Sequence, residues 1–164
     1  MVTLRISTGT FSYKDFAHLF DGPIHVALTN DSIKNLQRSH ERLISKINSG
    51  NTIYGVNTGF GNLSNIKIEP KDQKVLQLNL VRSHASGVGK PLELGLVRSI
   101  LVLKLLTYSK GYSGIRPDLP KKIVQFLNKD ILPVIPEKGS VGASGDLAPL
   151  SHMTLPLLGV GDVR

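Results

Sequence analysis

The sequence predicts a mainly α-helical fold with short β pieces near the N-terminus. Apolar residues recur at spacings of three and four along most of the 164-residue chain, which is the pattern of helices with one buried face. Proline and glycine separate these stretches, while β-prone runs such as VTLRIS and IHVALT fall within the first thirty residues. A chain of this length suits a single domain.

The first predicted helix follows the two β-prone runs. Asn30 and Asp31 are favoured residues for capping a helix N-terminus, and Gly50 is a typical stop. Between these signals, one face carries residues at helical spacing: Ile33, Leu36, His40, Leu43 and Ile47. The next stretch, NTIYGVNTGFGNLSN over residues 51–65, predicts a loop because three glycines and four asparagines disfavour a regular element. Loops of this kind often carry function.

Proline marks the beginning of two further helices. A helix is expected from Pro70, because proline is favoured at the first helical position, and it stacks Leu76, Leu80 and His84 before Gly87. Another helix is expected from Pro91 to near residue 111. Its residues 92–106 are apolar on nearly all sides, which indicates burial by several neighbours.

The last third of the chain predicts two shorter helices. One starts after Pro117 or Pro120 and reaches about residue 129, before prolines at 133 and 136 break the pattern. The other begins near Asp146. No internal repeat accompanies these elements.

Composition excludes several functional classes. The chain has no cysteine, which removes disulfides, thiolate nucleophiles and cysteine-ligated metals, and its five histidines lack zinc-binding spacing, so no metal is expected. The net charge is +8, but the Lys and Arg are scattered and aromatic residues are only 5%, which favours a solvated basic surface over nucleic-acid binding. The first residues lack the apolar core of a signal peptide, and Glu93, Arg98 and Lys104 interrupt the most apolar stretch. We therefore expect a cytoplasmic protein with no membrane partner.

Two familiar motifs fail on inspection. GVGK, at residues 87–90, is followed by Pro91, where a P-loop needs Ser or Thr for magnesium. GASGD differs from the G-x-S-x-G of hydrolases because Asp146 occupies the place of the second glycine.

The stretch GSVGASGDLAPLSHM, residues 139–153, allows two interpretations of Ala143-Ser144-Gly145. The first is an ordinary turn of small residues. In the second, the amide nitrogen of Gly145, which has no Cβ to block its approach, attacks the carbonyl carbon of Ala143 and closes a five-membered ring. Loss of two waters, one of them from the Ser144 hydroxyl, then leaves a 4-methylidene-imidazol-5-one (MIO), a strong electrophile. A helix beginning at Asp146 would direct its positive N-terminal end at this group and stabilise negative charge developing there.

Four stretches together carry a resemblance to the aromatic amino-acid ammonia-lyases. GSVGASGDLAPLSHM resembles the signature of that family, and YGVNTGFG from Tyr54, LVRSHASGVG from Leu80 and KGYSGIRP from Lys110 agree with it in order and spacing. The match spans at least residues 51–159. Within the family, the Ser83-His84 pair is most similar to histidine ammonia-lyases, although tyrosine-specific members can also carry the histidine.

The resemblance implies a function and a set of site residues. It implies elimination of ammonia from L-histidine to give urocanate, with Ala143, Ser144 and Gly145 forming the MIO electrophile and no external cofactor. It implies that Tyr54 is the catalytic base and that His84 contacts the substrate side chain. A tyrosine base needs its phenolate stabilised near neutral pH, and backbone donors of the glycine-rich loop are suited to this.

Each role has a structural alternative. Tyr54 can simply anchor its loop, and His84 can be a histidine satisfied within the core, which is the interpretation kept for His40 and His152. Five residues between 110 and 116 are expected to shape the wall of the site: Lys110, Gly111, Tyr112, Ser113 and Arg116.

The chain differs from the family in length. Family members are several times longer, form homotetramers and take site residues from later in the chain. We therefore expect residues 1–164 to form one N-terminal active-site region of a longer ammonia-lyase, without its C-terminal helical bundle. A tyrosine ammonia-lyase or aminomutase is the alternative within the family. A non-catalytic segment that only assembles with partner chains is the alternative outside it.

Overall fold

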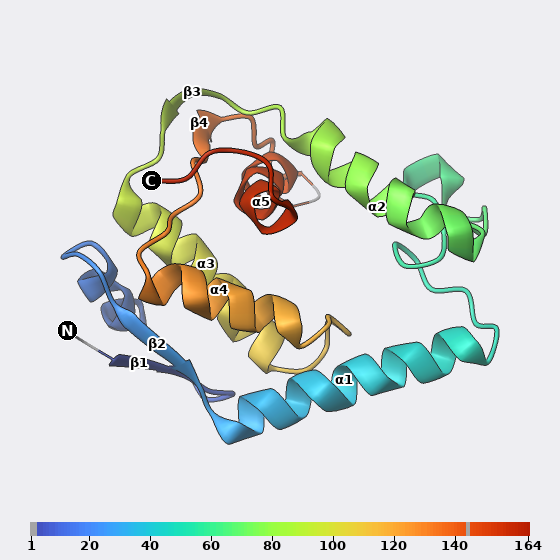
Figure 1. Cartoon of the computed structure of the whole chain (residues 1–164), viewed down its shortest axis with the longest axis horizontal. Helices are drawn as coiled ribbons and strands as arrows, with labels where there is room; N and C mark the ends of the chain where they lie inside the picture. Colours follow the sequence, from blue (N-terminus) through green and yellow to red (C-terminus); the bar gives the residue numbers. More distant parts are fainter. Residues whose placement is uncertain (1–2, 144) are drawn as a thin grey trace.

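The computed structural model of the chain describes residues 3–143 and 145–164, so Ser144 lies outside the described residues (Figure 1). Helices dominate, and the strands are short, which confirms the predicted fold class. The α-helices are α1 (Asn30–Asn48), α2 (Pro70–His84), α3 (Leu94–Ser109), α4 (Asp118–Asn128) and α5 (Leu147–Thr154). The strands are β1 (Thr3–Ile6), β2 (His25–Leu28), β3 (Val88–Pro91) and β4 (Pro136–Lys138), and the 3-10 helices are η1 (Tyr13–Leu19), η2 (Gly61–Leu63) and η3 (Leu155–Leu158).

The two predicted N-terminal β pieces form a parallel pair, with Thr3 opposite His25 and Ile6 opposite Leu28. The side chain of Asn128, at the end of α4, joins the backbone of β2. Its Oδ1 accepts from the Val26 amide at 2.6 Å, and its Nδ2 donates to the Val26 carbonyl at 3.0 Å. The amide side chain therefore satisfies strand groups that a third strand would otherwise pair.

Helix α3 is the centre of the core, as its apolar sequence predicts. Val97, Leu101, Val102 and Leu105 are fully buried, and the helix contacts α1, α4, η1 and β1. The prediction that this helix begins at Pro91 is wrong. Residues 88–91 pair with β4 instead, and the Leu92 amide donates to the Ile135 carbonyl at 2.8 Å, so the chain stays extended until Glu93.

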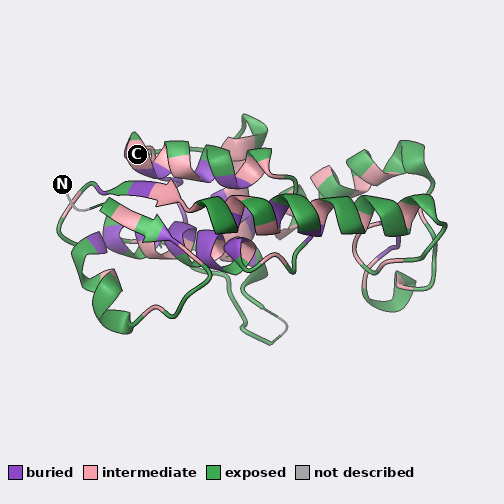
Figure 2. Ribbon diagram, turned by 90° about the horizontal axis from the view of Figure 1, so that it is seen from below, coloured by how far each residue is buried: buried purple, intermediate pink, exposed green. Residues whose placement is uncertain are grey.

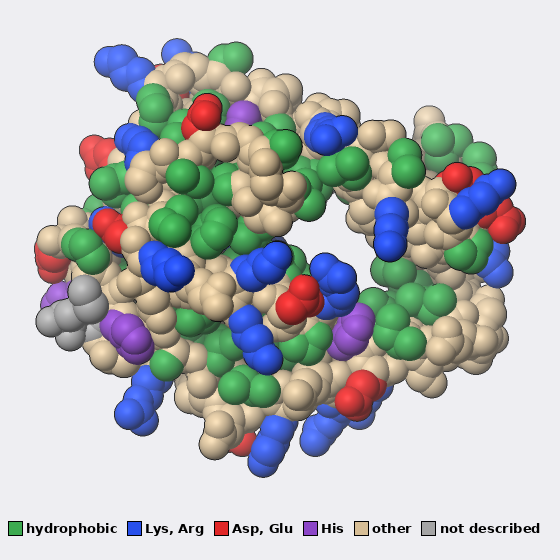
Figure 3. Space-filling model, in the orientation of Figure 1, with side chains coloured by type: hydrophobic (Ala, Val, Ile, Leu, Met, Phe, Trp, Pro, Cys, Tyr) green, Lys and Arg blue, Asp and Glu red, His purple; other side chains and the backbone are tan. Residues whose placement is uncertain are grey.

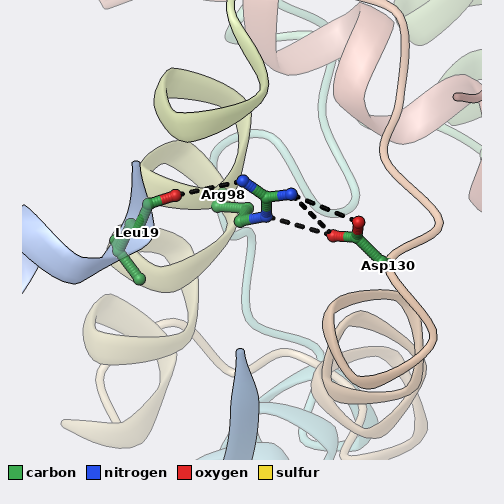
Figure 4. Close-up of polar contacts among 3 residues, drawn as sticks. All are labelled: Leu19, Arg98 and Asp130. Carbon is green, nitrogen blue, oxygen red and sulfur yellow. Dashed lines mark hydrogen bonds and ion pairs between the residues drawn. The ribbon is translucent and has the colours of Figure 1, made fainter. Parts of the chain in front are cut away.

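Arg98 ties α3 to two other segments, through an ion pair with the half-buried Asp130 and a hydrogen bond to Leu19 (Figure 4). Arg98, only 4% exposed, donates from Nε to Oδ1 of Asp130 at 3.0 Å and from Nη2 to Oδ2 at 3.2 Å. Its Nη1 donates to the carbonyl of Leu19 at 3.1 Å, at the end of η1. In the sequence, Arg98 stands out only as a charge that interrupts an apolar run. In the structure, its buried guanidinium is paired with Asp130.

Helices α1 and α2 extend beyond this core. The buried residues of α1 all lie in its first half, and α2 has none, as the green and pink surfaces of both helices show (Figure 2). Thr29, rather than Asn30 or Asp31, caps α1, and its Oγ1 accepts from the Ser32 amide at 3.3 Å. Helix α2 begins at Pro70 as predicted and packs against α5. Figure 3 shows an opening between α2 and the body of the molecule, with Lys and Arg side chains on part of its rim. Among the described residues, no helix is long and apolar enough to cross a membrane.

Candidate active site

Two pockets meet at the C-terminal end of α2, where this helix approaches α5 (Figure 1). The loop pocket, of about 230 Å³, is lined by Ser83, His84, Ser86, Gly139, Val141, Ala143, Gly145, Leu147 and Ala148. The tyrosine pocket, of about 680 Å³, is lined by Tyr54, Phe60, Gly61, Leu80, Val81, His84, Leu147, Leu150, Ser151 and Thr154. His84 and Leu147 border both pockets, so His84 lies between the described ends of the tripeptide and Tyr54.

The loop before α5 holds the described ends of the tripeptide at the surface. Ala143 and Gly145 are exposed, and Gly145 has a φ of +118°, a conformation that L side chains rarely adopt. No heavy atom lies within 4 Å of the position that a Gly145 Cβ would occupy. The Ser140 hydroxyl donates to Oδ1 of Asp146 at 2.5 Å, which closes the loop around residues 141–145. The positive φ and the open space beside Gly145 leave this position free of contacts with described residues outside its chain neighbours.

Helix α5 begins directly after this loop. The helix begins near Asp146, as predicted; Asp146 is its N-cap residue, and Leu147 and Ala148 of its first turn line the loop pocket. The positive end of this helix therefore borders the space beside Ala143 and Gly145.

The glycine-rich loop presents Tyr54 from the opposite side. Its ring is 63% exposed and meets Phe60 edge to face, with centroids 6.0 Å apart. The Tyr54 hydroxyl accepts a hydrogen bond from the backbone amide of Gly61 at 3.4 Å. This contact places a backbone N–H donor beside the phenolic oxygen.

Two side chains that sequence reasoning missed hold this loop. Asn57 is 3% exposed; its Oδ1 accepts from the Ile53 amide at 2.7 Å and its Nδ2 donates to the Asn51 carbonyl at 2.9 Å. Gln77 of α2 donates to the carbonyl of Gly55 at 3.0 Å, which fixes the glycine-rich loop to the helix that carries His84. The abundance of asparagine in residues 51–65 was visible in the sequence, but the pairing with Gln77 depends on the tertiary fold.

The half-buried His84 has a defined tautomer. Its Nδ1 lies 2.8 Å from the carbonyl oxygen of Leu80, and a carbonyl only accepts, so Nδ1 carries a proton. The Ser83 hydroxyl lies 3.2 Å from the same nitrogen. In the neutral ring, Nε2 is therefore an acceptor, and no described residue hydrogen-bonds to it.

The segment at residues 110–116, expected in the wall of the site, lies outside both the loop pocket and the tyrosine pocket of this chain. It packs against α1. A Cβ on Gly111 would lie 2.9 Å from Asn35, the Gly114 amide donates to the Ser39 hydroxyl at 2.8 Å, and Tyr112 is 91% exposed. Its role in the wall of the site stays a prediction, since among the described residues the turn after α3 directs the segment toward α1. The described residues contain no group of three acidic or histidine side chains placed to hold a metal ion.

The chain is similar in sequence to curated histidine ammonia-lyases. The chain is 43% identical to histidine ammonia-lyase of Shewanella woodyi over 99% of its own length and 32% of the relative's. It is 48% identical to a probable histidine ammonia-lyase of Thermoplasma acidophilum over 83% of its length and 27% of the relative's. The chain thus spans about a third of the length of the curated relatives it matches.

Solved structures share the fold. Tyrosine aminomutase from Streptomyces globisporus matches 98% of this chain, and 30% of its own, with a TM-score of 0.90 and 35% identity. Histidine ammonia-lyase from Trypanosoma cruzi matches all of this chain, and 31% of its own, with a TM-score of 0.88 and 32% identity. The sequence profile described as aromatic amino acid lyase matches residues 11–164. The chain belongs to the aromatic amino acid lyase family.

Proposed function

We propose that this chain supplies part of the active site of an ammonia-lyase that converts L-histidine to urocanate and ammonia. The observation that carries the proposal is the position of His84, which borders both the pocket beside Ala143 and Gly145 and the pocket beside Tyr54. We also propose that residues 1–164 act as one active-site region of a longer, cytoplasmic homotetrameric enzyme.

The residues at 143 and 145 fit the formation of MIO. The small Ala143, the open space beside Gly145 and the hydrogen bond between Ser140 and Asp146 favour closure of a ring from Ala143-Ser144-Gly145. Ring closure joins the Gly145 nitrogen to the Ala143 carbonyl carbon and, with dehydration of the Ser144 side chain, releases two waters. The finished group supplies an electrophile that makes the substrate amine a better leaving group.

The other residues bind the substrate and move its proton. The Nε2 of neutral His84 accepts a hydrogen bond from the imidazole N–H of histidine. Tyr54, as phenolate, takes a proton from the β-carbon, and the Gly61 amide stabilises the phenolate before that transfer. The electron pair of the broken C–H bond forms the double bond of urocanate as the C–N bond breaks and ammonia leaves.

A second candidate has a specific observation in its favour. The acceptor Nε2 of His84 suits the hydroxyl of a tyrosine substrate as well as an imidazole N–H, and tyrosine aminomutase is among the similar structures. A tyrosine ammonia-lyase or aminomutase is therefore the alternative enzyme. A chain that only assembles with partners is the alternative without catalysis.

Mass spectrometry of the peptide that contains Ser144 tests the electrophile. We expect the peptide to be lighter than its sequence by two waters. An unmodified mass would refute ring formation in this chain and favour the assembly role.

Substrate choice tests His84. In the longer enzyme that contains this chain, the His84→Leu variant should lose most histidine turnover, followed by the ultraviolet absorbance of urocanate, because it removes the acceptor. His18→Leu, a substitution of an exposed histidine outside both pockets, is the matched control. Unchanged histidine turnover in His84→Leu, or native turnover of tyrosine in preference to histidine, would refute the assignment.

A further inference from the structure

His152, in the last turn of α5, makes a contact that a core histidine does not require. Its Nε2 accepts a hydrogen bond from the backbone amide of Gly87 at 3.0 Å. A backbone N–H only donates, so Nε2 is unprotonated and the ring proton resides on Nδ1. The hydrogen bond therefore exists only in one tautomer of the neutral imidazole.

Gly87 lies where the segment after α2 touches the start of the loop before α5. Strand β3 pairs with β4 through Val88 and Lys138, and Gly87 and Gly139 are the next residues beyond this pair. A Cβ on Gly139 would lie 2.9 Å from the Cα of Gly87, so the two backbones are in direct contact. At the end of this ladder, the Gly87 amide is taken by the His152 side chain.

This junction connects the two sides of the proposed site. Gly87 follows His84 by three residues, and Gly139 begins the loop that leads to Ala143 and Gly145. Both His84 and Gly139 line the loop pocket. A contact that fixes Gly87 against α5 therefore fixes the distance between His84 and the loop.

We propose that neutral His152 is a positioning residue, which holds the segment after α2 against Gly139 and so aligns His84 with Ala143 and Gly145. The inference rests on the proposed function only in naming what is aligned. The hydrogen bond and its consequence for the loop belong to the chain whether or not it is an enzyme.

Protonation would break this contact. A proton on Nε2 converts the acceptor into a donor that faces another N–H, and the two repel. Burial lowers the pKa of His152, which favours the neutral form. The ionisable groups on the elements around it are Lys71, Asp72, Lys74, Arg82 and His84 on α2, Lys90 on β3, Glu137 and Lys138 on β4, and Asp146 before α5. None of them forms an ion pair with His152 among the described residues.

An NMR pH titration of the 17.8 kDa chain tests the proposal without any assay of activity. We expect the amides of Gly87 and Gly139 and the methyl group of Ala143 to shift with one midpoint, shared with the His152 ring and below the 6.5 of a free histidine. In His152→Gln these shifts should vanish, because the Gln Oε1 stands as many bonds from Cβ as Nε2 does and does not titrate. A shift that persists in His152→Gln belongs to another group, such as His84.

Amide exchange of Gly87, compared at one pH above 7, gives the second readout. We expect His152→Gln to exchange within about twofold of the native chain, since it keeps an acceptor. His152→Asn, whose oxygen is one bond short, should exchange about fivefold faster, as the loss of a hydrogen bond implies. Titration of His152 without movement of Gly87 would overturn the proposal, and so would movement of Gly87 alone, without Gly139 and Ala143. An unmodified Ser144 peptide would refute the proposed function and leave this result intact.

Discussion

Replacement of Asp130 by alanine should remove a large share of the stability of the chain. The change deletes both hydrogen bonds to the guanidinium of Arg98, whose side chain is 5% exposed, and leaves that cation without an anion. Breaking a buried pair from one side costs about 3–5 kcal/mol, but the Asp130 side chain is 32% exposed, so solvent screening reduces this to about 2–3 kcal/mol. Asp130 also has a φ of +51°, where alanine adds about 1 kcal/mol of strain. The expected loss in the free energy of unfolding is therefore about 3–4 kcal/mol.

Urea unfolding followed by far-ultraviolet circular dichroism measures this loss. Asp130→Gly should lose about 1 kcal/mol less than Asp130→Ala, because glycine adopts the positive φ without strain. Asp118→Ala is the control for an exposed pair: its partner Arg116 lies 3.4 Å away with 73% of its side chain exposed, so the loss should be within about 0.5 kcal/mol. A loss below about 1 kcal/mol for Asp130→Ala would refute the view that this pair holds α3 to η1 and to the end of α4.

Three further outcomes are expected. Leu101→Ala, at a fully buried position of α3, should lower the free energy of unfolding in urea by about 2–5 kcal/mol. Leu103→Ala, at a position 51% exposed on the same helix, should lower it by under about 1 kcal/mol. Equal losses would contradict the assignment of Leu101 to the buried face of α3. Asn57→Asp places a carboxylate oxygen against the Asn51 carbonyl, so it should lower the free energy of unfolding by about 1–3 kcal/mol and speed proteolysis within residues 51–61. Unchanged proteolysis would argue against the role of Asn57 in anchoring this loop. Because burial lowers the pKa of His152, the unfolded chain binds a proton first as pH falls below 6.5. The free energy of unfolding should therefore decrease from there down to the folded-state pKa of His152. In His152→Gln this pH-dependent loss of stability should be absent, and a pH profile identical to that of the native chain would exclude a contribution from His152.

Where helices begin was predictable because local chemistry sets it. Pro70 at a first helical position acts on its immediate neighbours, and the helix predicted from it is confirmed, as is the helix predicted to begin near Asp146. Pro91 was assigned wrongly to a helix because the same residue is equally compatible with the end of a strand. The choice depended on β4, which follows more than forty residues later.

The residues proposed for the site were predictable one by one, but their neighbours were not. Helical spacing placed His84 on the face of Leu80, and the four motifs pointed to Tyr54 and to the tripeptide. Their common location around two pockets needed the packing of α2 against α5. The hydrogen bond from Gln77 to Gly55 of the glycine-rich loop likewise joins residues 22 positions apart.

Periodicity and the residues that begin and end helices were sufficient for the helical class, since each acts within a few residues along the chain. Tertiary structure decided that Gly87 meets Gly139, that His152 accepts the Gly87 amide, and that residues 110–116 pack against α1. Such contacts join groups tens of residues apart, and their formation depends on how the core around α3 packs rather than on any local pattern.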